Sequence, residues 1–425
     1  MTSELDLKIE SLELTLGLSA GKSAYTDRSV EFRESCLQWS SADTTLYIGD
    51  NLKYLKEMAC STPEVVDLCY IDPPYNTGSK LMYNDRRKSK SVGVFGTHSA
   101  WLGFMLPRLV SARALLKDTG VIAISIDDYE YAHLKILMDN VFGEANFIGD
   151  VIVCRTKNGR GSKKNVAISH EHLLIYGKTK LAELRGQLDE SKYNKRDSHG
   201  QYRTDGLFRK KGDASLRTDR PNLFYPLYCH PTNGEVSVDP IDGWQEVYPL
   251  DSKGIERRWL WSADTARNKV WQLSASKNGV VYIKTYSGTK DKVKRTKLRT
   301  LWTDSSFYTE RGTDEIKELF GVKVFDTPKP LELIKKIIDV CANENSVVLD
   351  FFAGSGTTAH AVAQLNSEDN GSRQCILMES NHTIPYNHVA VEAGFGCISD
   401  ITEYRLRLIK GLNVVDNFNY QTIGN

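Results

Sequence analysis

Short apolar runs alternate with amphipathic stretches in two separate parts of this chain, and this rhythm limits the folds that it can adopt. The runs that favour β-strands lie at 44–50, 65–71, 121–126, 147–155, 170–178, 346–352 and 374–379. Helical spacing of apolar residues occurs at 51–58, 100–117, 129–141 and 330–341, and from Thr357 onward. Strands that alternate with helices form mostly parallel sheets with helices on both faces. The sequence therefore predicts a doubly wound α/β fold.

The chain divides into four parts by the quality of this pattern: 1–43, 44–180, 181–315 and 316–425. The second and fourth parts carry the α/β rhythm. The third part has poor periodicity and is rich in Tyr, Trp, Lys and Arg, so we interpret it as an inserted domain of short strands and loops. The first part is an N-terminal extension. Its apolar residues at alternate positions, such as Leu5, Leu7 and Ile9, are typical of a β-strand.

The composition indicates in which cellular compartment this protein is expected. The eight cysteines are scattered without a C-x-x-C pair, so neither a disulfide framework nor a metal site is predicted. No apolar run approaches the roughly 20 residues that a membrane-spanning helix needs. The first residues lack the pattern of a signal peptide. We therefore expect a cytoplasmic protein with no membrane partner.

The tetrapeptide Asp72-Pro73-Pro74-Tyr75 follows the apolar run 65–71 directly. Ligands of open parallel sheets bind at the carboxyl ends of the strands, which is where this motif falls. Two prolines make a rigid turn whose carboxylate and carbonyl oxygens can accept hydrogen bonds from an amino group, and the tyrosine offers a stacking surface for a planar base. The motif therefore predicts a site for chemistry on an exocyclic amine, although a simple turn that ends a buried strand is the plain alternative.

A glycine-rich turn, Asp350-Phe351-Phe352-Ala353-Gly354-Ser355-Gly356, joins the run 346–352 to a helix. Glycines in such a turn let the backbone approach a ligand closely. Glu379 ends the next predicted strand, where its carboxylate could accept hydrogen bonds from ribose hydroxyls. Alone, the glycine turn is weak evidence, but together with D-P-P-Y it indicates a nucleoside-containing cofactor.

These two motifs resemble those of the amino-methyltransferases of DNA, and the resemblance covers most of both α/β parts. In that family IDPPYNTG is the catalytic motif and LDFFAGSGTT binds S-adenosyl-L-methionine (AdoMet). The order seen here, with the catalytic motif first and the recognition domain between, is that of the β class. The resemblance implies a circularly permuted, seven-stranded AdoMet-dependent methyltransferase sheet. The chain is most similar to the modification (Mod) subunits of type III restriction systems and their solitary relatives.

The resemblance also assigns residues to roles. Residues 44–180 become the catalytic half, 181–315 the target-recognition insert and 316–425 the AdoMet-binding half. Asp72, Pro73, Pro74 and Tyr75 become the catalytic residues. The implied cofactor-binding residues are Asp50 near the adenine, Asp350 near the methionine amino group, Lys329 in the segment TPKPLEL, and Phe352, Gly354, Ser355, Gly356 and Glu379.

The expected function is site-specific methylation of the exocyclic N6 amino group of adenine in double-stranded DNA, with flipping of the target base. Methylation of cytosine at N4 is chemically similar, but family members with that specificity more often have Ser in place of Asp72. A non-catalytic DNA-binding relative would not need intact D-P-P-Y and glycine motifs. A dinucleotide oxidoreductase would be expected to carry G-x-G-x-x-G, which is not found after Gly354. A protein or RNA methyltransferase has no feature in its favour.

Basic residues beside aromatic ones are candidate DNA contacts. The segment 284–299 holds seven basic residues and one acid, although the whole chain has a net charge of only +1. Other candidates are Arg155, Lys157, Arg160, Lys163 and Lys164, the 76–98 segment with Arg86, Arg87, Lys88 and Lys90, and, as first trials for base reading, Arg257 and Arg258. The nearby tryptophans Trp244, Trp259, Trp261 and Trp271 could instead form a small core. Besides DNA, a second copy of the chain and a restriction subunit are candidate partners.

Overall fold

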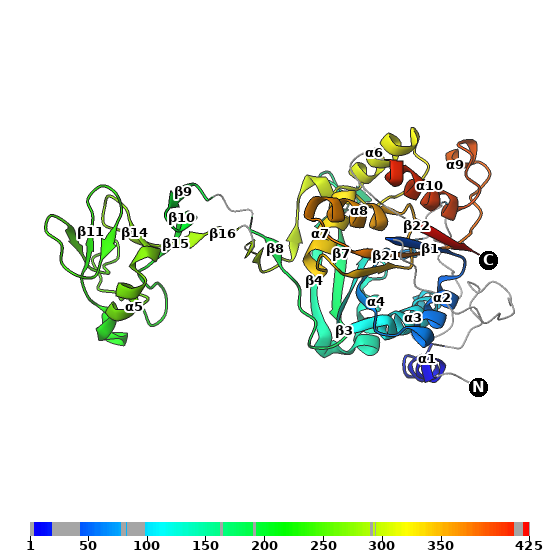
Figure 1. The fold of residues 1–425 in the computed structure, drawn as a ribbon. Coiled ribbons are helices and arrows are strands. Elements are labelled where there is room, and N and C mark those ends of the chain that lie inside the picture. Colours follow the sequence, from blue (N-terminus) through cyan, green and yellow to red (C-terminus); the bar gives the residue numbers. More distant parts are fainter. Residues whose placement is uncertain are drawn as a thin grey trace. The chain divides into compact units, whose positions relative to one another are not determined.

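The computed structural model describes residues 4–18, 43–77, 82, 98–161, 165–189, 193–289, 292–293, 295–411 and 420–424. The chain forms two compact units (Figure 1). The first comprises residues 1–187 together with 297–425, and the second comprises 188–296. The second unit lies inside the predicted insert, and it is shorter than 181–315 at both ends.

The first unit is built on a nine-stranded sheet with the order β19-β4-β7-β3-β2-β20-β21-β1-β22. In that order the strands span Leu301–Trp302, Phe147–Cys154, His170–Gly177, Leu116–Ile126, Val66–Ile71, Val347–Asp350, Gln374–Glu379, Thr44–Ile48 and Tyr420–Gly424. Strand β7 runs antiparallel to both of its neighbours, and the other pairings in this sheet are parallel. The seven central strands are the seven predicted from the sequence, and β19 and β22 add one strand at each edge. The predicted α/β fold is confirmed.

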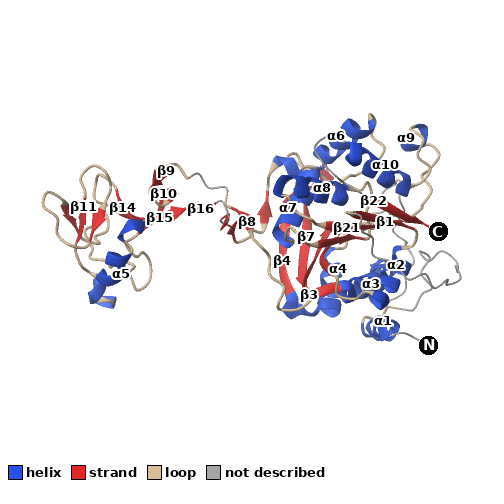
Figure 2. Cartoon of the chain, viewed as in Figure 1, coloured by secondary structure: helices blue, strands red, loops and turns tan. Residues whose placement is uncertain are grey.

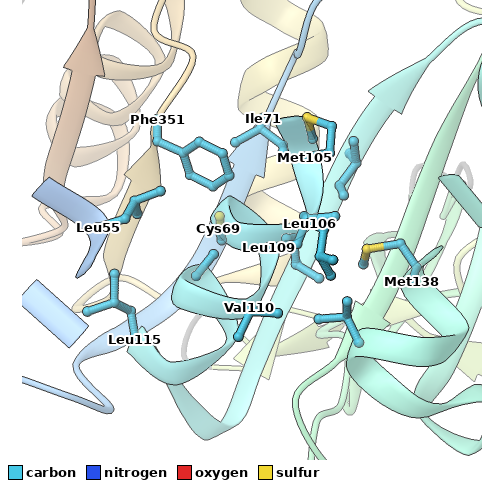
Figure 3. Packing of buried hydrophobic residues seen from close by; sticks show 14 of the residues in the cluster. Leu55, Cys69, Ile71, Met105, Leu106, Leu109, Val110, Leu115, Met138 and Phe351 are labelled. Atoms are coloured by element: carbon cyan, nitrogen blue, oxygen red, sulfur yellow. The ribbon is translucent and has the colours of Figure 1, made fainter. Parts of the chain in front are cut away.

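Helices cover both faces of this sheet (Figure 2). One face carries α1 (Glu4–Thr15), α2 (Asn51–Ser61), α3 (Ser99–Leu115) and α4 (Tyr131–Met138). The other carries α7 (Leu331–Cys341), α8 (Thr357–Asp369) and α10 (Ile398–Gly411), while α6 (Thr309–Phe320) and α9 (Val389–Glu392) pack with Phe325 and Ile401 in a smaller cluster. On the first face, side chains of α2, β2 and α3 interdigitate, as Leu55, Cys69 and Leu109 do in Figure 3. No helix among the described residues is long and apolar enough to cross a membrane.

The prediction of a β-strand near the N-terminus is wrong, because residues 4–15 form the helix α1. Leu5, Ile9 and Leu12 are spaced by four and three residues, and they pack against the main core. Leu7 and Leu14 point away and are 56% and 85% exposed. The same segment thus contains both an alternating and a helical spacing of apolar residues. The helix forms because it turns the helically spaced residues toward the core.

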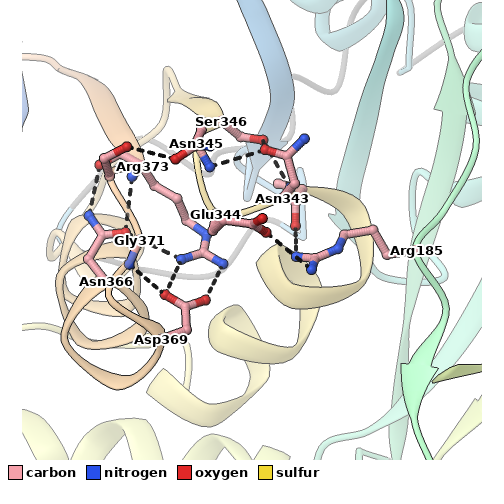
Figure 4. A network of polar contacts seen from close by, with 11 residues as sticks. Arg185, Asn343, Glu344, Asn345, Ser346, Asn366, Asp369, Gly371 and Arg373 are labelled. Atoms are coloured by element: carbon pink, nitrogen blue, oxygen red, sulfur yellow. Dashed lines mark hydrogen bonds and ion pairs between the residues drawn. The ribbon is translucent and has the colours of Figure 1, made fainter. Parts of the chain in front are cut away.

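A polar network holds the amino ends of β20 and β21 (Figure 4). Arg373, whose side chain is fully buried, pairs with Asp369 at 2.7 Å and spans the turn after α8. Arg185 donates from Nη1 to the carbonyl oxygen of Ala342 at 2.8 Å, in the loop before β20. The network therefore stabilises the edge of the sheet opposite the carboxyl ends of these strands.

The second unit has a four-stranded sheet, β14-β15-β10-β9 (Leu273–Ala275, Val281–Tyr286, Gly200–Leu207 and Lys195–Asp197). A three-stranded sheet, β12-β11-β13 (Val236–Ser237, Leu227–Cys229 and Gln245–Val247), and the helix α5 (Ala263–Asn268) complete it. Phe208 stacks on Trp259 at 5.2 Å between ring centroids, and both are buried in the core of this unit. Trp259 is therefore a core residue, which agrees with the alternative prediction that these tryptophans form a small core. Trp271 is 39% exposed and stacks on His199.

Short two-stranded ladders make up the rest of the described strands. They are β5 (Arg160–Gly161) with β6 (Ala167–Ile168), β8 (Gln187–Leu188) with β18 (Arg295–Thr296), and β16 (Gly288–Thr289) with β17 (Lys292–Val293).

Candidate active site

A pocket opens at the carboxyl ends of β1, β2, β20 and β21, where the sequence placed its motifs. Nine of the predicted site residues line it: Asp50, Asp72, Pro74, Lys329, Asp350, Phe352, Gly354, Ser355 and Glu379. Pro73, Tyr75 and Gly356 are not among the lining residues. One cavity therefore brings together the two motifs that lie some 280 residues apart in the chain.

The glycine turn shapes one wall of this pocket. Gly354 has a φ of +52°, and its backbone N–H donates to Oε2 of Glu379 at 2.6 Å. A Cβ at Gly354 would lie 3.2 Å from the ring of Phe325, another lining residue. Gly356 has a φ of +79° and forms the N-cap of α8, so its part is to turn the chain into the helix.

Two carboxyl groups at this wall have raised pKa values. Burial raises the pKa of Asp350 to about 7, against the lowering effect of hydrogen bonds from the Thr358 hydroxyl and the Phe352 N–H. Burial likewise raises the pKa of Glu379 to about 7, although the N–H groups of Gly354 and Ser380 donate to it. A ligand that donates hydrogen bonds or carries positive charge would favour the ionised form of both groups.

Asp50 is oriented by a residue that the sequence analysis missed. Its carboxylate caps α2 through the N–H of Leu52, and Nη2 of Arg108 lies 3.2 Å from Oδ1. Arg108 is 5% exposed, lines the pocket and also donates from Nε to the side chain of Asn51 at 2.7 Å. The sequence did offer a signal for Arg108, which is a charged residue on the apolar face of a predicted helix. Such a residue is rarely buried without a partner of opposite charge.

At the other wall, Lys329 joins the D-P-P-Y motif to strand β7. Its Nζ atom donates to Oδ1 of Asp72 at 2.8 Å, to the Tyr75 hydroxyl at 2.7 Å and to Oε2 of Glu171 at 3.3 Å. The Tyr75 hydroxyl in turn donates to Asp72 Oδ1 at 2.6 Å, and Nε of Arg155 lies 3.3 Å from Glu171. Two acids and two bases thus form one cluster around the tyrosine.

Glu171 was not predicted from the sequence, although it stands out as a carboxylate in the apolar strand β7. It is 2% exposed. Burial raises its pKa, but Lys329 and Arg155 lower it more, so that the net shift is downward. The carboxylate is therefore ionised, and together with Asp72 it balances the charge of the two bases. Arg155, a predicted DNA contact, lies within this cluster.

The backbone of the D-P-P-Y loop is fixed from two sides. The indole N–H of Trp101 donates to the carbonyl oxygen of Pro74 at 2.7 Å. Asn76, which follows the motif, has a φ of +56° and donates from Nδ2 to Oε1 of the buried Glu130 at 2.5 Å. Asn is one of the few non-glycine residues that adopt the left-handed conformation readily, and its hydrogen bond to Glu130 fixes the loop in it.

Comparison with known proteins agrees with this geometry. Residues 66–392 match the family model described as DNA methylase (N6_N4_Mtase). The chain belongs to the DNA methylase family. It is thus a DNA methyltransferase, with AdoMet as its methyl donor, and the sequence-based predictions of enzyme class, cofactor and DNA substrate are confirmed. A dinucleotide oxidoreductase is ruled out.

Individual relatives refine this placement. The methylase is 61% identical over 379 residues to the type II methyltransferase M.KpnI of Klebsiella pneumoniae, with 89% of each chain covered. It is 33% identical to the EcoPI Mod subunit of Escherichia phage P1 and 36% identical to the StyLTI Mod subunit of Salmonella typhimurium. Those alignments cover 90% and 84% of this chain, but 65% and 55% of the Mod subunits. The predicted resemblance to Mod subunits is confirmed.

Several candidate DNA contacts are engaged within the protein. Arg257 pairs with Asp251 through Nε and Nη2 and donates from Nη1 to Ser215, and Arg258 donates from Nε to the carbonyl oxygen of Ala214. Lys284 pairs with Asp197 at 2.7 Å. Lys163, Lys164, Arg86, Arg87, Lys88 and Lys90 lie outside the described residues, and so does the side chain of Arg160.

Proposed function

We propose that this methylase transfers the methyl group of AdoMet to the N6 amino group of adenine in double-stranded DNA. One observation carries the proposal. Asp72, an acceptor suited to an exocyclic amine, lines the same pocket as Gly354 and Glu379, which suit a nucleoside cofactor. The pocket thus offers room for donor and acceptor within reach of each other.

The adenine amine is a weak nucleophile because its lone pair is conjugated with the ring. Asp72 Oδ1 already accepts from Lys329 and Tyr75, which leaves Oδ2 for one amine hydrogen. The carbonyl oxygen of Pro73 is our candidate acceptor for the other. Two acceptors draw the amine toward a tetrahedral geometry and free its lone pair. AdoMet would supply the methyl group and leave as the neutral thioether, and Asp72 would receive the proton that N6 loses as its bond to carbon forms.

The cofactor would be held at the glycine wall. AdoMet supplies an electrophilic methyl group on a positively charged sulfur. Glu379 would accept from the ribose hydroxyls, Asp350 would bind the methionine amino group, and Asp50, held by Arg108, would lie near the adenine. Phe352 and Ser355 line the same pocket and complete this binding surface.

The remaining parts of the prediction stay proposals. Tyr75 would support the flipped base through its ring, while its hydroxyl is held by Asp72 and Lys329. Residues 44–180 would be the catalytic half, 316–425 the AdoMet-binding half and 181–315 the region that recognises the target, with 1–43 as an extension. A cytoplasmic location, a second copy of the chain and a restriction subunit belong to the same proposal.

Analysis of the methylated product tests the proposal. DNA that contains many sequences would be incubated with the enzyme and AdoMet, digested and analysed by mass spectrometry. N6-methyladenine is expected. Asp72→Asn should abolish its formation while AdoMet still binds in a calorimetric titration. N4-methylcytosine as the only product, or near-normal turnover by Asp72→Asn, would contradict the assignment.

A further inference from the structure

A second polar cluster lies outside the pocket, at the start of β7. His170 and His172 are two residues apart on this strand, so their side chains lie on the same face of the sheet, and Glu171 between them points to the opposite face. His172 stacks on Tyr131 of α4 with 3.9 Å between ring centroids. The loop between β3 and α4 brings Asp128 to the two imidazoles.

The distances between donor atoms suit a tetrahedral metal ion. Nε2 of His172 lies 3.2 Å from Oδ1 of Asp128, and Nε2 of His170 lies 3.6 Å from the same oxygen. The three donor atoms all lie within 4.8 Å of one another. Zinc is bound by nitrogen and oxygen at about 2.0–2.2 Å, so tetrahedral ligands around it are separated by about 3.3 Å. The two separations between a histidine nitrogen and the Asp128 oxygen are close to this value.

A fourth residue, Asp150, is placed where its carboxylate can hold the ring of His172. Nδ1 of His172 lies 3.0 Å from Oδ2 of Asp150 on the neighbouring strand β4. Metal-binding histidines usually donate their other ring N–H to a carboxylate, which fixes the ring and leaves Nε2 free to bind the ion. Stacking on Tyr131 holds the ring from its face. His172 is thus oriented toward Asp128 before any ion arrives.

Charge and access favour a dication as well. When both imidazoles bind as neutral ligands, the carboxylates of Asp128 and Asp150 leave a charge of −2, which one divalent ion neutralises. The side chains of Asp128 and His170 are 44% and 33% exposed, so an ion can enter from solvent. Three protein ligands leave a fourth position for water. Imidazole with carboxylate is a donor set that suits Zn²⁺ and similar transition metals better than Mg²⁺.

We propose that His170, His172 and Asp128 bind one divalent transition-metal ion such as Zn²⁺, with Asp150 supporting His172. The ion would tie β7 to the loop between β3 and α4. This site is separate from the AdoMet pocket, none of whose lining residues belongs to it. The proposal therefore does not depend on the assignment of the methylation target.

Cobalt titration of the full-length protein, free of any histidine tag, tests the site, because four-coordinate Co²⁺ absorbs visible light strongly. We expect saturation at one ion per chain, displacement by Zn²⁺, and a higher melting temperature with Zn²⁺ than with a chelator. His170→Ala and Asp128→Asn should abolish the visible bands. Asp150→Asn should weaken binding by about 10- to 100-fold.

Two variants serve as controls. His199→Ala removes a histidine of the second unit, and His133→Ala removes one from the cluster of His98, Glu130 and His133, which is a rival metal-binding group. Both should bind Co²⁺ like wild type. Absence of binding by wild type at micromolar Co²⁺, unchanged binding by His170→Ala, or loss of binding in His133→Ala would overturn the proposal. Melting curves in chelator show whether each variant is folded.

Discussion

Nζ of Lys329 lies 2.8 Å from Oδ1 of Asp72, although 257 residues separate them in the chain. The sequence resemblance placed Lys329 with the cofactor, and it does line the pocket. In the structure its ammonium also bonds to the D-P-P-Y motif and to Glu171. Lys329 therefore lines the pocket and holds the D-P-P-Y motif and β7 together, while its part in cofactor binding stays a prediction.

Replacing Lys329 by Met should impair both turnover and stability. Without the ammonium, the pKa of Glu171 rises, so the acidic limb of the pH–rate profile should move to higher pH. Breaking a buried ion pair on one side costs about 3–5 kcal/mol, which denaturant unfolding would detect. Lys335→Met is the control, because its partner Glu368 is exposed and such pairs contribute about 0–1 kcal/mol. A wild-type pH profile in Lys329→Met would contradict the role.

AdoMet binding should strengthen as the pH rises through 7. The pKa values of Asp350 and Glu379 are raised to about 7, so both groups are largely protonated at pH 6 and ionised at pH 8. Each should contribute up to about a tenfold decrease in the dissociation constant over this range. Calorimetric titrations at pH 6, 7 and 8 would measure it, and Glu379→Gln should show weaker binding with a smaller pH dependence. A dissociation constant that does not change with pH counts against the idea.

The same raised pKa predicts a stability effect of opposite sign in the protein without cofactor. Between the ordinary pKa of a glutamate, near 4.5, and about 7, the folded state keeps a proton on Glu379 that the unfolded state releases. This group therefore makes the free energy of unfolding fall as the pH rises through that window. Glu379→Gln removes the titration, so its stability relative to wild type should increase from pH 5 to pH 7.5. Melting temperatures at both values test the sign, and a constant difference would refute it.

Gly354→Ala should weaken AdoMet binding. The new Cβ would lie 3.2 Å from the Phe325 ring at the pocket wall, in a backbone conformation with positive φ. Gly321→Ala is the matched control, since Gly321 also has a positive φ but its Cβ position has no atom of the described residues within 4 Å. Both variants should lose roughly 1–3 kcal/mol of stability from backbone strain. Only Gly354→Ala should raise the dissociation constant for AdoMet, and equal affinities of the two would contradict this.

Exchange of residues 188–296 with those of a relative of known specificity should transfer the target sequence. This segment forms a compact unit of its own, with its own core around Phe208 and Trp259. Arg257→Ala, by contrast, should destabilise the unit because Asp251 and Ser215 hold its guanidinium. Sequencing of the methylated DNA would read the specificity, and a target site that stays with the α/β halves would disprove the assignment.

The sequence by itself determined the local elements and the two motifs. All seven central strands were predicted from apolar runs, because buried strands need them on both faces. Asp72 and Glu379 both line the pocket, because Asp72 follows β2 and Glu379 ends β21, and the carboxyl ends of these strands meet at one edge of the sheet. The helix α1 was missed, since an alternating pattern does not reveal which of its leucines the core will cover.

Only the tertiary structure decided which charges meet. Arg108, Glu171 and Lys329 come from α3, β7 and the segment before α7, and nothing in their local sequence names Asp50 or Asp72 as their partners. Pairing across a sheet depends on strand order and register, which are long-range properties of packing. The burial that raises the pKa values of Asp350 and Glu379 likewise exists only once the strands and helices close around them.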